Sequence, residues 1–282
     1  MMKKHVRVWL QTNRWFKCVP NSLTLCNSLC GFLAILITLR AYEAESLDES
    51  LTAFFAGAVI ICCAMVFDSL DGLAARIFNA ASMHGVQMDS LADMVTFGVA
   101  PATLVAVMTH SLRVSSHLGR PEEVLIYLLC SVYVGCAALR LATYNVHAIL
   151  EKKSSEKFSG LPSPGAAAGI CVVIAYAWKC DFNITKYVVA LPAYAAFLGL
   201  LMVSPIPYTH VGKWICSVRR NRKRMLLLAV MVLIAIVFRI PGIAAIVTIY
   251  IFTGPVLALR RIFFHGGKAG ESPADSAKTA ER

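Results

Sequence analysis

Four aspartates lie close together in an otherwise apolar part of the chain, namely Asp68, Asp71, Asp89 and Asp93. Of the 282 residues, 58% are hydrophobic and only 15% are charged, so this concentration of carboxylates needs an explanation. The two members of each pair are three or four residues apart, which places both side chains on one face of a helix. Like charges in such density repel one another and need a cation. Oxygen ligands without His or Cys suit Mg²⁺ or Mn²⁺ better than zinc.

The residues around these aspartates fit phosphate chemistry. Two divalent ions can stabilise the attacking and leaving oxygens of a phosphoryl transfer. Gly72 and Gly85 leave room for a ligand near the backbone, and Arg76 can meet phosphate oxygens or orient a carboxylate. Solvated or ion-paired helix ends would explain one or two aspartates, but not four in this setting. The spacing therefore predicts a metal site that handles a phosphate compound.

The rest of the chain predicts the helices that carry these side chains. Apolar runs recur along the sequence and are continuous rather than alternating, which favours helices that cross a hydrocarbon layer of roughly 30 Å. The fold class is therefore an all-α polytopic integral membrane protein with about eight transmembrane helices, and counts of six or seven are left open because some runs are short. The predicted helices are Leu23–Leu39, Leu51–Phe78, Val86–His110, Val124–Tyr144, Ala166–Trp178, Tyr187–Val203, Met225–Phe238 and Ile243–Leu259.

The basic residues predict the orientation, because Lys and Arg accumulate in cytoplasmic segments. A cytoplasmic start places most of the 27 Lys and Arg residues inside, including the cluster in residues 213–224. Both termini and the aspartate ends of the helices are then cytoplasmic, and the expected location is the bacterial inner membrane. We interpret the net charge of +11 as this topology signal and as attraction to anionic lipid, not as nucleic-acid binding.

Three segments are expected along the chain. Residues 1–20 mix Trp, Phe and Val with basic residues, which predicts an amphipathic segment lying on the cytoplasmic leaflet. Residues 21–262 form the transmembrane domain. Residues 263–282 are mostly small and polar, which predicts a disordered cytoplasmic tail.

The acidic stretch also resembles the signature of a known family. The pattern is Asp68-x2-Asp71-Gly72-x2-Ala75-Arg76-x8-Gly85-x3-Asp89-x3-Asp93, and it is similar, without gap or substitution, to that of the CDP-alcohol phosphatidyltransferases. The resemblance covers residues 20–167 well, whereas the later helices match only as apolar spans. It implies a membrane enzyme, acting as a homodimer, that transfers the phosphatidyl group of CDP-diacylglycerol to an alcohol and releases CMP.

The resemblance implies a role for each matching residue. Asp68, Asp71 and Asp89 would bind the metal ions that hold the diphosphate, and Asp93 would be the general base and a further metal contact. The segment PNSLT at residues 20–24 resembles the family's PN-x-LT segment, although Asn21 is equally well interpreted as a capping or packing residue. The residues that the resemblance assigns to CDP-lipid binding are Asn21, Thr24, Gly72, Ala75, Arg76, Ser82 and Gly85.

Two further segments indicate the acceptor. FSGLPSPGAA at residues 158–167 resembles the F-x-GLPSP-x-AA segment of the phosphatidylserine synthase branch, and RLATYN at residues 140–145 resembles its RLARFN segment with two replacements. The implied acceptor is L-serine, whose carboxylate needs one cationic contact, whereas glycerol 3-phosphate would need several. The acceptor-binding candidates are Arg140, Asn145 and Lys157. A topology role explains Arg140 as well, and Lys157 is also typical of a solvated loop.

Two alternatives stay open at this point. The same chemistry could use glycerol 3-phosphate, inositol phosphate or choline as the acceptor. An ion-coupled transporter is the alternative from another class, because membrane carboxylates often belong to such proteins. It is disfavoured because the aspartates gather near one membrane face and the other half of the sequence has no comparable cluster.

Overall fold

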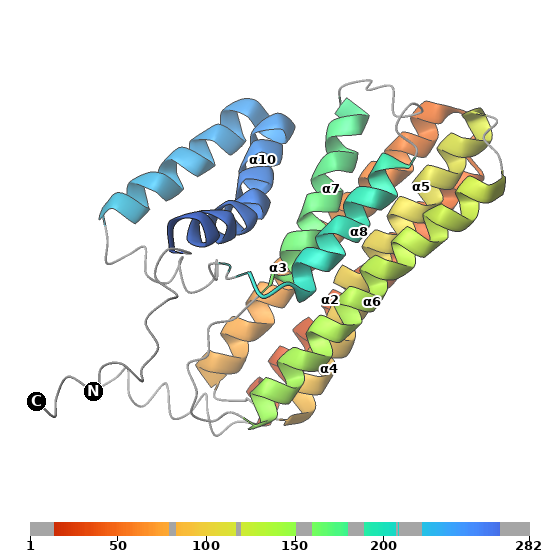
Figure 1. Ribbon diagram of the computed structural model, residues 1–282. Helices are drawn as coiled ribbons and strands as arrows, with labels where there is room; N and C mark the ends of the chain where they lie inside the picture. The colour runs from red at the N-terminus through yellow and green to blue at the C-terminus, as the bar shows by residue number, and fades with distance from the viewer. Residues whose placement is uncertain are drawn as a thin grey trace, which may run out of the picture.

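The structure is a computed structural model that describes residues 14–78, 83–116, 120–150, 160–179, 189–206, 208 and 222–265. Within these ranges the regular structure is entirely helical, which confirms the predicted all-α class. The elements are α2 (Arg14–Leu39), η1 (Arg40–Tyr42), α3 (Leu47–Phe78), α4 (Met83–Asp93), the π-helical η2 (Met94–Val99), α5 (Ala100–Ser116), α6 (Arg120–Leu150), α7 (Ser163–Lys179), α8 (Ala190–Val203) and α10 (Arg222–His265). Figure 1 shows a long bundle with α10, sharply bent, beside α7.

Five helical stretches of the described chain are long and apolar enough to cross a membrane, so the protein is an integral membrane protein. They are Val19–Tyr42, Leu47–Ala74, Met83–Leu112, Glu123–Val146 and Leu233–Ala258. The third stretch runs without a break through α4, η2 and α5. The helices α7 and α8 are apolar but shorter. The expected total of eight spans stays a prediction.

The predicted helices all occur, with altered bounds. The helix α2 begins at Arg14 rather than Leu23, because an apolar run marks only the part of a helix that suits lipid. The two last predicted helices are joined in α10 across a kink at Arg239, where φ is 49° and ψ is −123°. Pro241 follows closely, and its ring and missing N–H interrupt a helix. The predicted break is therefore confirmed.

Residues 1–13 and 266–282 lie outside the described residues, so the amphipathic segment and the tail assigned to them stay predictions.

Close packing and hydrogen bonds hold the helices together, because lipid is as apolar as the side chains that it surrounds. The helix α2 lies along α3, α6 lies along α8, and α7 contacts α3 and α10. Phe54, Phe97 and Tyr133 are fully buried between these helices. The Tyr133 hydroxyl donates a hydrogen bond of 2.8 Å to the Phe97 carbonyl, so α6 is fastened to η2 by a polar contact as well.

Gly199 allows α8 to approach α6 closely, and its replacement gives a first prediction. A Cβ atom at this position would lie 2.9 Å from Cα of Tyr133, closer than real Cβ atoms come. Gly199→Ala should therefore lower the free energy of unfolding by about 1–3 kcal/mol, measured as a lower Tm in detergent. Gly135→Ala on α6 is the matched control, because no atom lies within 4 Å of the added Cβ there. Equal Tm values for the two variants would contradict the close approach.

Candidate active site

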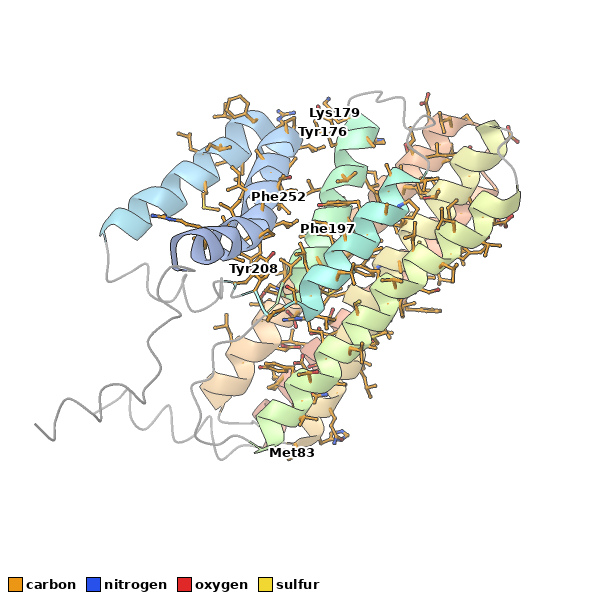
Figure 2. The ribbon with its side chains drawn as sticks, viewed as in Figure 1. Met83, Tyr176, Lys179, Phe197, Tyr208 and Phe252 are labelled. Atoms are coloured by element: carbon orange, nitrogen blue, oxygen red, sulfur yellow. The ribbon has the colours of Figure 1, made fainter. Side chains whose placement is uncertain are left out.

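Three of the four aspartates, two from the end of α3 and one from α4, come together beside α2, against which both helices pack. Carboxylate oxygens of Asp68, Asp71 and Asp89 all lie within 4.8 Å of one another. Figure 2 marks this end of the bundle by Met83 at the start of α4, opposite Lys179 at the end of α7. The predicted convergence of these carboxylates is confirmed.

Asp93 lies one turn after Asp89 in α4, and its side chain has different neighbours. Its carboxyl group is within hydrogen-bonding distance of the Asp68 carboxyl. The amide Nδ2 of Asn27 on α2 donates a hydrogen bond of 3.2 Å to Asp93 Oδ1. Asp93 is thus attached to the edge of the three-carboxylate cluster and is oriented by a neutral donor.

The helix α2 holds both acidic helices in place. Thr24 donates a hydrogen bond of 2.9 Å to Asp71 Oδ2, and Asn27, three residues later, reaches Asp93. Both α2 side chains are buried, and the hydroxyl of Thr96 donates a bond of 3.0 Å to the Asn27 carbonyl. The sequence interpretation included Thr24 but did not assign Asn27 to the site. The sequence did carry a signal for Asn27, because it lies three residues after Thr24 and therefore on the same face of the helix.

The turn that follows Asp93 is π-helical over Met94–Val99. A π turn changes the backbone hydrogen-bond pattern and is frequent at functional sites. Two hydrogen bonds to other helices stabilise this turn: the Tyr133 hydroxyl of α6 donates to the Phe97 carbonyl, and the Thr96 hydroxyl of the turn donates to the backbone carbonyl of Asn27 on α2. The direction in which Asp89 and Asp93 face therefore depends on both α2 and α6.

A second polar group lies where α6 ends and α7 begins. Arg140 Nη1 donates a hydrogen bond to Ser163 Oγ, and the guanidinium is within electrostatic range of the Asp93 carboxylate. Asn145 Oδ1 accepts a bond of 2.8 Å from Ser90, the residue after Asp89. Two of the predicted acceptor residues, Arg140 and Asn145, are therefore beside the aspartate helices. The third, Lys157, lies outside the described residues.

The segment before α7 is fixed by its backbone. Gly160 has a φ of 89°, which favours glycine, and a Cβ there would clash with the Met202 carbonyl. The N–H of Gly160 donates to Ile206 O at 2.8 Å, and the N–H of Leu161 donates to Leu201 O at 3.0 Å. These contacts with the end of α8 place Ser163 at the first turn of α7, where it meets Arg140.

The other predicted site residues are only partly described. Asn21 is exposed on α2, and an added Cβ at Gly72 would meet nothing within 4 Å, so open space adjoins Asp71. Thr143, which stands where the RLARFN segment has its second arginine, is exposed, and its hydroxyl donates to the Leu139 carbonyl of the same helix. Of the remaining residues, Gly85 lies in α4. The side chains of Ala75 and Arg76 are not described, and Ser82 lies outside the described residues.

The carboxylate cluster fits a divalent cation. Asp71 is buried, with 6% of its surface exposed. Oδ1 of Asp89 is also buried and has no hydrogen-bond partner in the described part of the chain. Buried anionic oxygens without compensation cost several kcal/mol. A hard divalent ion would remove the repulsion and give this oxygen a partner, so the donor set suits such a metal.

A helical membrane protein with this cluster beside one end of its bundle has the architecture of a membrane enzyme for phosphoryl chemistry. The chain belongs to the CDP-alcohol phosphatidyltransferase family, whose profile matches residues 17–252. It is therefore a phosphatidyltransferase.

Three relatives illustrate the similarity. The chain is 33% identical over 197 residues to the CDP-diacylglycerol–serine O-phosphatidyltransferase of Bacillus subtilis, covering 69% of this chain and 92% of that protein. It is 31% identical over 198 residues to the archaetidylserine synthase of Methanothermobacter thermautotrophicus, covering 70% and 71%. It is 26% identical over 253 residues to the CDP-diacylglycerol–serine O-phosphatidyltransferase of Helicobacter pylori, covering 89% and 96%. No solved structure matches the chain significantly.

The contact between Asn27 and Asp93 gives a second prediction. Asn27→Ala removes the donor that orients the carboxylate, so kcat should fall by about 10-fold while the KM for the CDP-lipid changes little, because the loss affects positioning rather than lipid binding. Steady-state rates of CMP release would measure both constants. Cys26→Ala, on the exposed side of the same helix, is the control and should behave like the wild type. An unchanged kcat in Asn27→Ala would contradict the positioning role.

Proposed function

We propose that the protein transfers the phosphatidyl group of CDP-diacylglycerol to the hydroxyl of L-serine, giving phosphatidylserine and CMP. The observation that carries this proposal is the cluster of Asp68, Asp71 and Asp89, with Asp93 at its edge and the pair of Arg140 and Ser163 in range. A lipid diphosphate and a small polar acceptor could meet between these groups. The relatives named as serine phosphatidyltransferases support serine as the acceptor.

The chemistry divides between the carboxylates. Asp68, Asp71 and Asp89 would hold two Mg²⁺ or Mn²⁺ ions, with Asp93 as a further contact; when bound, the ions neutralise the charge of the diphosphate. Asp93 accepts the proton of the acceptor hydroxyl while that oxygen forms a bond to the lipid-proximal phosphorus. The bond from this phosphorus to the bridging oxygen breaks, and the bridging oxygen leaves with CMP. Asn27 keeps the Asp93 carboxylate turned towards the acceptor.

The remaining predicted residues complete the two binding regions. Arg140 would meet the carboxylate of serine, while Asn145 and Lys157 would contribute hydrogen bonds and charge. Thr24 supports Asp71 directly. The residues proposed for the CDP-lipid region are Asn21, Thr24, Gly72, Ala75, Arg76, Ser82 and Gly85.

The membrane arrangement is part of the same proposal. Eight spans with both termini in the cytoplasm would put the start of α2, the end of α3, the start of α4, the end of α6 and the start of α7 on the cytoplasmic side. These are the helix ends that carry the site, and the distribution of basic residues supports that side. The proposed location is the bacterial inner membrane, and the proposed assembly is a homodimer.

The decisive experiment uses the purified full chain in mixed micelles with CDP-diacylglycerol, a divalent ion and one acceptor at a time. L-serine should give CMP and phosphatidylserine, and a chelator should stop both. Glycerol 3-phosphate, inositol phosphate and choline should give little CMP. Preferential use of another acceptor would overturn the choice of serine.

A further inference from the structure

Tyr250, in the last apolar stretch of α10, brings a polar group to a part of the protein that the sequence interpretation treated only as an apolar span. Its hydroxyl is buried and has no hydrogen-bond partner among the described residues. It also lies within electrostatic range of Arg140, the side chain that is bonded to Ser163. A buried hydroxyl without a partner is unfavourable, so a bound group that accepts its hydrogen bond would be favoured.

The ring of Tyr250 is held in this place by its neighbours. A Cβ added at Gly165 in α7 would lie only 3.2 Å from Tyr250 Cε1, so glycine leaves the space that the ring needs. On another side the ring packs against Tyr208, with centroids 6.0 Å apart. The Tyr208 hydroxyl is already used, because it donates a bond of 2.9 Å to the Ile251 carbonyl. Figure 2 shows Tyr208 between α10 and the end of α8.

The chemistry of these groups suits a carboxylate. Arg140 offers only donors, and the Tyr250 hydroxyl can add one more donor from a different helix. Such a pair suits the two oxygens of a carboxylate, and hydrogen bonds to a charged group are stronger away from bulk water. Arg140 is also in range of Asp93, the proposed base. An acceptor with its carboxylate at Arg140 and Tyr250 can therefore direct its hydroxyl towards Asp93.

We infer that Tyr250 is a specificity-determining residue that donates a hydrogen bond to the carboxylate of the acceptor amino acid beside Arg140. This inference rests on the proposed function. It makes α10 part of the acceptor site. An alcohol without a carboxylate would lack this contact and would leave the Tyr250 hydroxyl without a hydrogen-bond acceptor. Sites of this kind discriminate strongly against analogues that lack the matching polar group.

The test compares Tyr250→Phe with the wild type in the full chain, using CMP release in mixed micelles. The variant removes one oxygen atom and keeps the ring. The KM for L-serine should rise by about 10-fold or more, the usual effect of losing a hydrogen bond to a charged group. The inhibition constant of ethanolamine, which lacks the carboxylate, should change by less than about 2-fold, as should the KM for CDP-diacylglycerol. Tyr208→Phe is the matched control and should leave the KM for serine unchanged.

Two further measurements guard against a folding defect. Serine should raise the Tm of the wild type more than that of Tyr250→Phe, while the two have similar Tm values without serine. Gly165→Ala, which crowds the tyrosine ring, should produce the same selective rise in the KM for serine. An unchanged KM for serine in Tyr250→Phe, or an equal loss for ethanolamine, would overturn the inference. If the wild type itself releases no CMP with serine, it is the proposed function that fails.

Discussion

Asp93→Asn is expected to lower kcat by at least about 100-fold and by up to about 10 000-fold, the usual contribution of a general base. The amide has nearly the size of the carboxylate and can still accept the hydrogen bond from Asn27, which is 3.2 Å long in the wild type. It cannot take the proton of the acceptor hydroxyl. The measurement is the rate of CMP release at saturating CDP-diacylglycerol, serine and divalent ion.

Substrate binding provides the control for this variant. Asp68, Asp71 and Asp89 are unchanged, so metal-dependent binding of the CDP-lipid should be largely retained. A direct binding assay with the CDP-lipid, with and without chelator, would measure it. Turnover of Asp93→Asn within about 10-fold of the wild type would remove Asp93 from the base role.

Asp71→Ala is the second large effect that we expect. The change removes one of three clustered carboxylates, and it leaves the Thr24 hydroxyl without its acceptor on α3. Loss of a partner outside the metal ligands commonly costs about 10–100-fold in metal affinity or activity, so loss of a ligand should raise the metal concentration for half-maximal activity by about 100-fold or more. Titration of CMP release with Mg²⁺ or Mn²⁺ would measure the change.

Thr24→Val is the comparison for this variant, because it removes the hydroxyl that supports Asp71 and keeps the carboxylate. It should shift the metal dependence less than Asp71→Ala does. A metal titration of Asp71→Ala that superimposes on that of the wild type would rule out Asp71 as a ligand, whatever the effect on the maximal rate.

Much of the fold could be predicted from the sequence, because a segment that crosses lipid must be apolar and must satisfy its own backbone hydrogen bonds, as a helix does. Continuous apolar runs revealed the helices, and the separation of the last two runs between Phe238 and Ile243 indicated where α10 is interrupted. The bounds could not be predicted in the same way. The end of an apolar run says where lipid ends, whereas α2 and α6 continue as helices into polar residues.

The carboxylate cluster was predictable because spacing on a helix decides which side chains share a face. The contacts of Asn27 with Asp93 and of Ser163 with Arg140 were not, because they join residues of different helices. Tyr250 was the hardest to foresee. It lies in a strongly apolar stretch, and only the packing of α10 against α7 brings its hydroxyl towards Arg140.

The wide turn at Met94–Val99 has a consequence for anyone who redesigns or aligns this helix. An α-helix advances by about 100° per residue, and a π turn, with its i→i+5 hydrogen bonds, advances by less, so tightening these same residues to ordinary α geometry would rotate everything before the turn relative to everything after it. With the downstream half anchored by Tyr133, the acidic face would swing away from α3. A substitution that only tightened this turn would thereby dismantle the cluster without altering any aspartate.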